Sequence, residues 1–348
     1  MRPARAVGIV LFAVVAASGR AQESADFTVG NATAAAGKRA LGALEVPPGS
    51  DAGLNIPVAV LHGAWPGPVL TIVSGLHGTE YASILAVERL IERLDPTDVT
   101  GTVILIPIVN LPAFEHKTMH VNPTDGKSMN RLFPGRPDGT QTERVAYALT
   151  HQVVEKSDAL IDMHGGDLDE SLRPYTYWTR TGNEKLDGTA RDMALAFGID
   201  HIVVATDRPR DPNASRYLDT TAVTRGKPAI AVEAGSAGRT EAEDVTLLVN
   251  GCLSVLRHFK MLPGTPAPVT HPVWIEGVRT VASEHTGIFF PAVERGSFVE
   301  QGTRLGTITD FLGRKLAETR SPVTGIVLSE AASGDEAPHC CALEREAD

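Results

Sequence analysis

Four side chains able to bind a metal or transfer a proton follow three apolar segments of the sequence. His77 and Glu80 lie three residues apart after `LTIVSG`, His164 ends `ALIDMH`, and Glu233 ends `AIAVE`. Alone, each would more often be a capping or packing residue, but together they favour a site. Two imidazoles and a carboxylate bind zinc tetrahedrally and leave a fourth position for water. We predict one zinc ion per chain on His77, Glu80 and His164, with Glu233 as the carboxylate that accepts a proton from activated water.

A polar loop adds a candidate for binding the substrate. Asn130 and Arg131 are adjacent in `NPTDGKSMNRLFPG`, residues 122–135. A guanidinium group can bind a carboxylate through two hydrogen bonds and thereby orient it. The structural alternative is an arginine that pairs with an acid across the loop, and the spacing alone does not decide between them.

The elements that must position these residues are those of an α/β domain over residues 27–262. Five apolar runs predict strands: `PVLTIVSG`, `GTVILIPIVN`, `DALIDMHG`, `HIVVAT` and `PAIAVEAG`. Their nearly continuous hydrophobicity indicates burial on both faces and predicts a largely parallel sheet. Helical periodicity over residues 82–94, 141–154, 184–197 and 240–259 separates them. Because the carboxyl ends of parallel strands meet at one edge, we expect the candidate residues to converge there.

The sequence changes in character after Met261. A proline-rich hinge, `LPGTPAPVTHP`, leads into short apolar runs separated by glycines, with no helix-length apolar period. This pattern predicts a small all-β domain over residues 269–335. We expect residues 336–348 to form a tail.

The first 21 residues have the three-part pattern of a secretory signal. Arg2 and Arg5 precede an apolar run over residues 6–17, and small residues lead to Ala21. A membrane-spanning helix needs about 20 apolar residues, and this run is shorter. We therefore predict a signal peptide over residues 1–21, and a periplasmic or extracellular protein with no membrane attachment after cleavage.

Composition limits the partners. The formal charge of −10 argues against nucleic acid or an anionic membrane surface. Cys252 falls in an apolar helical pattern, whereas Cys340 and Cys341 are adjacent, and their state stays open. With three cysteines, stability must come mainly from the core rather than from disulfides. The sequence also leaves open whether the chain forms a homo-oligomer.

Four motifs resemble those of the succinylglutamate desuccinylase/aspartoacylase family, in the zinc carboxypeptidase-like superfamily. They are `GLHGTE` (75–80), `NRLFPG` (130–135), `DMHGG` (162–166) and `VEAGS` (232–236), in the family's order, and the similarity covers residues 28–335. The resemblance implies a three-layer α/β/α domain with a mixed sheet and a small C-terminal β-domain. It also implies zinc-dependent hydrolysis of the amide bond in an N-acyl amino acid or a small peptide-like substrate.

The resemblance also implies roles for individual residues. His77, Glu80 and His164 become the zinc ligands, and Glu233 becomes the general base that later protonates the leaving amine. Asn130 and Arg131 match the pair that holds the α-carboxylate of the substrate.

One departure from the family concerns the charge near the scissile carbonyl. The family usually has a carbonyl-polarising arginine just upstream of `P-x-D-G`, but this chain reads `FEHKTMHVNPTDG`. Lys117 and His120 are the basic candidates there besides His116. We predict Lys117 as a substrate-binding residue, together with Tyr217 in `SRYLD`. The other histidines, His120 among them, lack placement at a strand end, and we expect most of them to be surface or structural residues.

Three other functions remain as alternatives. The chain resembles zinc metallocarboxypeptidases enough that removal of C-terminal residues from peptides is a second hypothesis. A serine hydrolase would use Ser236, in an incomplete nucleophile-elbow motif, with His258 as its base. A carrier-type binding module would use Lys315 in the C-terminal domain, but its surroundings lack the carrier motif.

Overall fold

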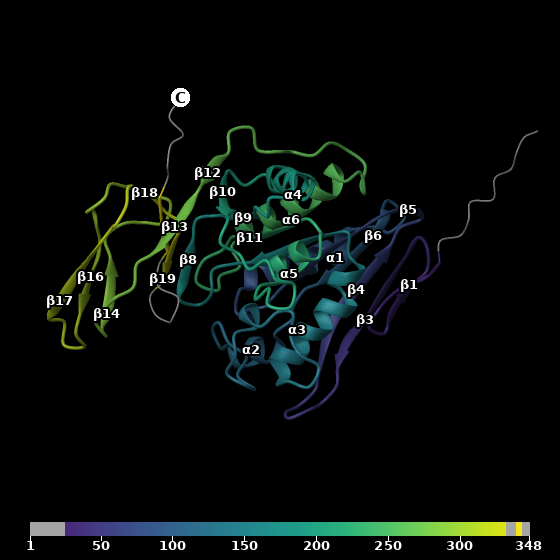
Figure 1. Cartoon of the computed structure of the whole chain (residues 1–348), viewed down its shortest axis with the longest axis horizontal. Coiled ribbons are helices and arrows are strands. Elements are labelled where there is room, and N and C mark those ends of the chain that lie inside the picture. Colours follow the sequence, from purple (N-terminus) through teal and green to yellow (C-terminus); the bar gives the residue numbers. More distant parts are fainter. Residues whose placement is uncertain (1–24, 332–338, 343–348) are drawn as a thin grey trace, which may run out of the picture.

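The computed structural model describes residues 25–331 and 339–342, so the predicted signal peptide and most of the predicted tail lie outside the described residues. A nine-stranded mixed sheet forms the middle layer of the larger domain (Figure 1). From one edge to the other, its strands are β12 (Val273–Ile275), β10 (His201–Ala205), β9 (Tyr175–Thr179), β11 (Ala229–Glu233), β7 (Ala159–His164), β5 (Trp65–Ser74), β6 (Thr100–Ile106), β4 (Leu54–His62) and β3 (Lys38–Val46).

The central strands are buried on both faces, as their apolar runs predict. In β5, the neighbouring residues Ile72 and Val73 are fully buried in two different hydrophobic clusters, and Leu105 and Ile106 of β6 behave in the same way. Successive side chains of a strand point to opposite faces, so the two clusters are the two sides of the sheet. The five predicted strands are all present, within a few residues of their predicted bounds.

The prediction of a largely parallel sheet is confirmed, because five of the eight strand pairings are parallel, including those of β10 with β9 and with β12. Strand β5 pairs in parallel with β6 and β7, and β7 pairs in parallel with β11. In contrast, β9 runs antiparallel to β11, and β4 runs antiparallel to both β3 and β6. The sheet is therefore mixed, as the family resemblance implies.

Helices cover both faces of the sheet and complete three layers (Figure 1). Their bounds are α1 (Tyr81–Arg93), α2 (Leu111–His116), α3 (Gln141–Gln152), α4 (Glu184–Phe197), α5 (Leu218–Thr224) and α6 (Ala242–His258), with short 3-10 turns η1 (Met129–Arg131) and η2 (Val154–Lys156). Side chains of α1, α4 and α6 enter one core cluster, and those of α3 and α5 enter the other. A hairpin of β1 (Phe27–Val29) and β2 (Ala32–Ala34) packs on the second face. Among the described residues, no helix combines the length and the apolarity needed to cross a membrane.

Helix α3 begins with a reciprocal capping box. The Thr140 side chain accepts a hydrogen bond from the Glu143 backbone, and Glu143 Oε2 accepts one from the Thr140 backbone N–H at 3.0 Å. Lys127 Nζ lies 2.9 Å from the same carboxylate oxygen. The Thr140 backbone bond and the Lys127 contact lower the pKa of Glu143 to about 2.

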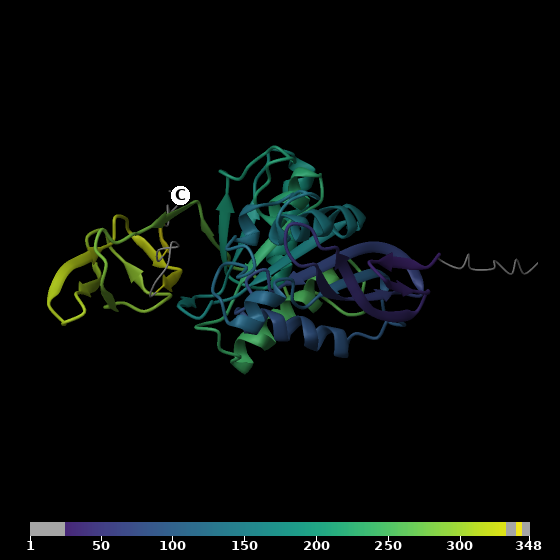
Figure 2. The same ribbon diagram turned by 90° about the horizontal axis from the view of Figure 1, so that it is seen from below.

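The C-terminal domain is all-β and projects from one end of the α/β domain (Figure 2). One sheet contains β13 (Gly277–Thr280), β20 (His339–Ala342), β18 (Gly325–Val327) and β15 (Phe298–Val299), and the other contains β14 (Ile288–Pro291), β16 (Arg304–Thr309) and β17 (Lys315–Arg320). A further strand, β19 (Ser329–Ala331), pairs with β8 (Glu170–Leu172) of the larger domain.

Two boundaries differ from the predicted ones because strand pairing crosses them. Strand β12 lies inside the predicted β-domain range, yet it pairs with β10 and extends the central sheet. Strand β20 lies inside the predicted tail, yet its backbone pairs with both β13 and β18. Short segments such as these carry too little local pattern to reveal a partner that is distant in the sequence.

Candidate active site

A cavity of about 640 Å³ opens at the carboxyl ends of the central parallel strands. His77 and Glu80 follow β5, His164 ends β7, and Glu233 ends β11. The register pairs Glu233 with His164 on the neighbouring strand. All four residues line the cavity, so the predicted convergence is present.

A tight turn after β5 presents His77 and Glu80. Gly75 has φ of +66°, a left-handed conformation in which glycine carries little strain. Asn110 fixes the turn by donating its backbone N–H to Gly75 O and its side-chain amide to Leu76 O. A Cβ on Gly78 would lie 2.3 Å from the Phe114 backbone nitrogen, so a larger residue there would displace the turn from α2. The positive φ of Gly75 and the close approach of Gly78 to α2 explain why the turn contains these two glycines.

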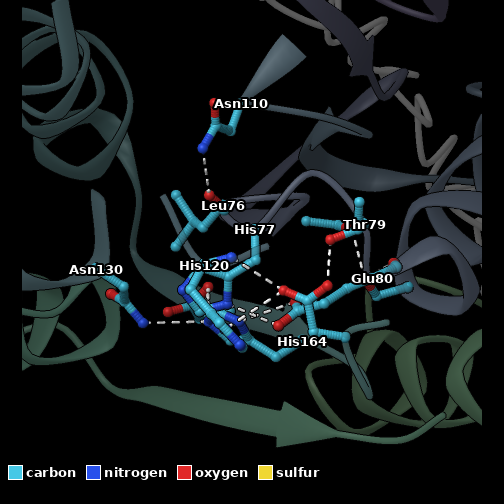
Figure 3. Close-up of polar contacts among 12 residues, drawn as sticks. Leu76, His77, Thr79, Glu80, Asn110, His120, Asn130 and His164 are labelled. Atoms are coloured by element: carbon cyan, nitrogen blue, oxygen red, sulfur yellow. Dashed lines mark hydrogen bonds and ion pairs between the residues drawn. The ribbon is translucent and has the colours of Figure 1, made fainter. Parts of the chain in front are cut away.

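The three predicted ligands face one another at the base of the cavity (Figure 3). His77 Nδ1 lies 2.6 Å from Glu80 Oε1, and His164 Nδ1 lies 3.1 Å from Glu80 Oε2. One ligand atom from each residue falls within 4.8 Å of the other two. Burial raises the pKa of Glu80, but the charges of His77 and His164 outweigh it and lower this pKa to about 2. This cluster of two nitrogens and a carboxylate fits a divalent metal such as zinc.

Polar groups behind His164 orient its ring. His164 Nε2 lies 3.2 Å from Asp162 Oδ1 and 3.3 Å from Asn130 Nδ2. Burial lowers the pKa of His164, but Asp162, Glu80 and Glu233 raise it well above its usual value. A carboxylate behind a ligand histidine selects the ring tautomer and leaves the opposite nitrogen able to bind metal. Asp162 is therefore a site residue that the sequence reasoning missed, although its place two residues before His164 was a usable signal.

Glu233 lies near charged groups of both signs, the imidazole of His164 and the carboxylates of Glu80 and Glu170. It is partly exposed to the cavity, and it lies opposite Tyr175 of β9 as well as opposite His164 of β7. Burial raises the pKa of Glu233 well above its usual value, His164 opposes that shift, and the carboxylates of Glu80 and Glu170 add to it. A carboxylate with a raised pKa is suited to accept and return a proton near neutral pH.

Guanidinium groups surround Tyr217 on another wall of the cavity. The Arg131 guanidinium carbon lies 5.1 Å from the centre of the Tyr217 ring, and that of Arg208 lies 4.1 Å from it. Arg208 also lies 5.0 Å from the Tyr177 ring, so two aromatic faces hold its orientation. Burial lowers the pKa of Arg208, but the charge of Asp219 outweighs this effect, so the pKa of Arg208 is raised above its usual value. The sequence reasoning missed Arg208, which follows β10 and was detectable only as a basic residue after a strand.

Three of the four predicted substrate-binding residues lie at the cavity, and the fourth does not. Asn130, Arg131 and Tyr217 line the cavity. Asn130 Oδ1 also accepts a hydrogen bond from the Leu218 backbone at 3.0 Å, so this amide positions the start of α5. Lys117 is exposed at the end of α2 and does not line the cavity, so this geometry adds no support to its assignment to substrate binding, which stays a prediction. Its left-handed φ of +52° ends the helix there.

The residues named for the serine-hydrolase and carrier-module hypotheses lack the contacts that those functions need. Ser236 Oγ donates to Ser171 Oγ at 2.8 Å, and His258 lies at the end of α6 against the Phe259 ring. Among the described residues, no contact joins Ser236 to an imidazole. Lys315 Nζ lies 2.6 Å from Glu318 on strand β17.

The C-terminal domain contributes one wall of the cavity. Residues 276–280, on and just before β13, line it. Arg295 of the same domain donates to Leu172 O at 2.5 Å and to Gly235 O at 3.4 Å. These bonds attach the domain to strand β8 and to the loop that follows Glu233.

Comparisons with known proteins agree with this geometry. Residues 66–259 match the family model described as succinylglutamate desuccinylase/aspartoacylase catalytic domain. An N-alpha-acetyl-L-2,4-diaminobutyric acid deacetylase of Halomonas elongata is 30% identical over 260 residues, 74% of either chain. A succinylglutamate desuccinylase/aspartoacylase structure from Rhodobacter sphaeroides has a TM-score of 0.77 at 27% identity, covering 89% of this chain and 96% of that one. The product-bound ectoine utilization protein EutE (DoeB) of Ruegeria pomeroyi has a TM-score of 0.78 at 25% identity, covering 88% and 94%.

Proposed function

The chain belongs to the succinylglutamate desuccinylase/aspartoacylase family, and from this we propose that it is a zinc-dependent amidohydrolase acting on an N-acyl amino acid. The observation that carries the proposal is the convergence of His77, Glu80 and His164 beside Glu233 in one cavity. The guanidinium groups of Arg131 and Arg208 form a cationic wall of the same cavity, and their charge supports an anionic substrate.

The residues of this chain divide the reaction among them. Zinc held by the three ligands would supply Lewis-acid chemistry, which activates water and polarises a carbonyl near neutral pH. Glu233 takes the proton of the attacking water as the water oxygen bonds to the amide carbon. When the carbon–nitrogen bond breaks, Glu233 returns this proton to the leaving amine, so that an amino acid and a carboxylic acid are released. Its raised pKa suits both transfers.

The cationic wall sets the orientation of the substrate. Arg131 and Arg208 stack against Tyr217, which limits the freedom of both guanidinium groups. A planar guanidinium binds a carboxylate through two parallel hydrogen bonds. We propose that this wall binds the α-carboxylate, which places the acylated nitrogen toward His164 and Glu233.

A hydrolysis screen tests the proposal. Zinc-loaded protein lacking residues 1–21 is incubated with N-acetyl and N-succinyl amino acids whose side chains are neutral, acidic or basic, and with short peptides bearing free C-termini. Release of free amine from one N-acyl class, its loss with 1,10-phenanthroline and its recovery with zinc are the expected results. No release from any N-acyl amino acid overturns the proposal. Release from the peptides alone would instead favour the metallocarboxypeptidase hypothesis.

We also propose that the protein is exported. The support is the pattern of charged, apolar and small residues before Ala21. Expression of the full chain in a Gram-negative host, followed by fractionation and N-terminal sequencing, should give a periplasmic or secreted protein that begins at Gln22. A cytoplasmic product that retains residues 1–21 would contradict export without affecting the proposed chemistry.

A further inference from the structure

The loop that follows Glu233 has a strained backbone. Ala237 has φ of +50°, a left-handed conformation that is uncommon for a residue with a side chain. Such a backbone is maintained only where neighbouring contacts determine it, and strained residues cluster at functional sites. The chain passes from the end of β11, at Glu233, directly into residues 234–238, so the contacts of this loop also hold the end of the strand.

Strand β8 supplies contacts that hold the loop. Glu170 O accepts the Ala237 backbone N–H at 2.7 Å, and Gly235 O accepts the Leu172 backbone N–H at 3.2 Å. One bond runs from the loop to the strand and the other from the strand to the loop, as in a short strand pairing. The position of the loop therefore depends on the position of β8.

The C-terminal domain in turn holds β8. Strand β19 of that domain pairs with β8 in a sheet of two strands (Figure 1). Leu172 is fully buried in a cluster that also contains Ile326 and Leu328 of the C-terminal domain. Tyr175 of β9, the register partner of Glu233, belongs to the same cluster. The C-terminal domain thus supports the surroundings of Glu233 through β8 and through the packing of Tyr175.

Arg295, a surface residue of the C-terminal domain, joins the loop and β8 directly. A guanidinium group has several N–H donors in one plane, and here Nη1 donates to both Leu172 O and Gly235 O. Burial raises the pKa of Asp244 in α6 and of Glu330 in β19, and the charge of Arg295 opposes both shifts. The guanidinium group therefore lies between the two domains, where it holds the loop and the strand that supports it.

We propose that Arg295 is a positioning residue for Glu233. By binding Gly235 O and Leu172 O, it holds residues 234–238 in the course that directs the Glu233 carboxylate toward the attacking water and the leaving amine. Catalytic groups must be held within about 0.5 Å of their productive geometry. Arg295 does not line the cavity, so it acts through the loop rather than on the substrate. The inference rests on the proposed amidohydrolase function, in which Glu233 transfers the proton.

Two other arginines separate this role from the general attachment of the domain. Arg173 also lies at the domain boundary, where a Cβ on Gly296 would lie 3.5 Å from its Nη1, but its side chain bonds to Asp200 and His201. Arg320 Nη1 donates to a backbone carbonyl inside the C-terminal domain, that of Gly302, at 2.8 Å. Arg173→Met and Arg320→Met are therefore matched controls, and both should keep the wild-type kcat.

The experiment compares Arg295→Met with the wild type on the N-acyl amino acid that the wild type hydrolyses fastest. Methionine keeps a long side chain but removes the N–H donors. We expect kcat to fall by about 10–10²-fold, because a displacement of about 1 Å can slow a reaction by as much as 10²-fold. KM and zinc content should stay at the wild-type values, since the cationic wall and the predicted zinc ligands lie on other elements. Arg295→Lys restores a cationic donor and should recover part of kcat.

A double variant tests whether Arg295 acts through Glu233. In the Glu233→Gln background, Arg295→Met should cause no further loss of kcat, because the group that it positions is already inactive. A further loss as large as that in the wild-type background would show independent action and would overturn the proposal.

Hydrogen exchange tests the structural step without any substrate. The backbone amides of Leu172 and Ala237 should exchange faster in Arg295→Met than in the wild type, and at the wild-type rate in Arg320→Met. The proposal is overturned if Arg295→Met keeps the wild-type kcat or the wild-type exchange at both amides. It is also overturned if Arg173→Met lowers kcat equally, or if KM and zinc content change together with kcat, because both patterns describe general support of the fold. Failure of the wild type to hydrolyse any N-acyl amino acid would instead refute the proposed function.

Discussion

Glu233 and His164 are direct register partners at the carboxyl ends of two adjacent parallel strands, β11 and β7. Each residue belongs to a strand that is buried in both core clusters, so neither can move without disturbing the sheet. The carboxylate that we propose as proton acceptor and one predicted zinc ligand are thus held at a fixed separation by backbone pairing. A site built on strand ends is better defined than one built on loops.

The first prediction is zinc dependence. Purified protein should contain about one zinc per chain, because three protein ligands define one site. His77→Ala removes one ligand and should lose metal and activity together, as measured by elemental analysis and amine release. Active protein without any metal would contradict the zinc hypothesis.

The second prediction separates Glu233 from the ligands. Glu233→Gln keeps the shape of the side chain but cannot accept a proton, so activity should fall by about 10²–10⁴-fold. Zinc content should stay at the wild-type level because Glu233 is not a ligand in this assignment. Glu88→Gln, on the exposed face of α1, is the matched control and should change neither quantity. Loss of zinc from Glu233→Gln would make Glu233 a ligand instead.

The third prediction concerns the cationic wall. Arg131→Ala should lower kcat/KM by an amount equivalent to about 2–5 kcal/mol, since it leaves a desolvated carboxylate unpaired. Arg208→Ala should also weaken binding, and Tyr217→Ala should weaken it through the loss of both stacking contacts. Arg136→Ala, an exposed arginine of the same loop region that pairs with Asp138, is the control. Steady-state kinetics that give the wild-type kcat/KM for Arg131→Ala would assign Arg131 a structural role.

The fourth prediction concerns stability and pH at the start of α3. The folded state lowers the pKa of Glu143 from 4.5 to about 2. The stabilisation from this carboxylate is therefore complete above pH 4.5 and disappears as the pH falls toward 2. Glu143→Gln keeps a side chain able to complete the capping box but removes its charge, so it should destabilise the protein by about 0.3–1 kcal/mol near pH 7. This difference from the wild type should shrink between pH 4.5 and 2, and urea denaturation at several pH values measures it.

A control distinguishes the capping box from a general charge effect. Glu92→Gln removes the same charge from an exposed position on α1 and should show little difference at any pH. A constant deficit for Glu143→Gln across the whole pH range would show that the carboxylate charge does not contribute.

The sequence by itself determined the central elements and the predicted ligands. Continuous apolar runs identify strands that are buried on both faces, and a polar residue at the end of such a run is held at the sheet edge. His77, Glu80, His164 and Glu233 were therefore predictable, because each lies at the end of its strand or in the turn that follows it. The order of the motifs along the chain was enough to indicate the family.

Tertiary structure decided what local patterns do not encode. Pairing of β9 with β10 and β11, and of β12 with β10, involves segments far apart in the chain, and it brings Arg208 to Tyr177. Folding of the loop after α2 turns Lys117 to solvent and places His120 between Asp167 and Asp169, 47 or more positions along the chain. Such contacts depend on how strands and loops pair over long distances, whereas hydrophobic periodicity reports only on the nearest turns of the chain.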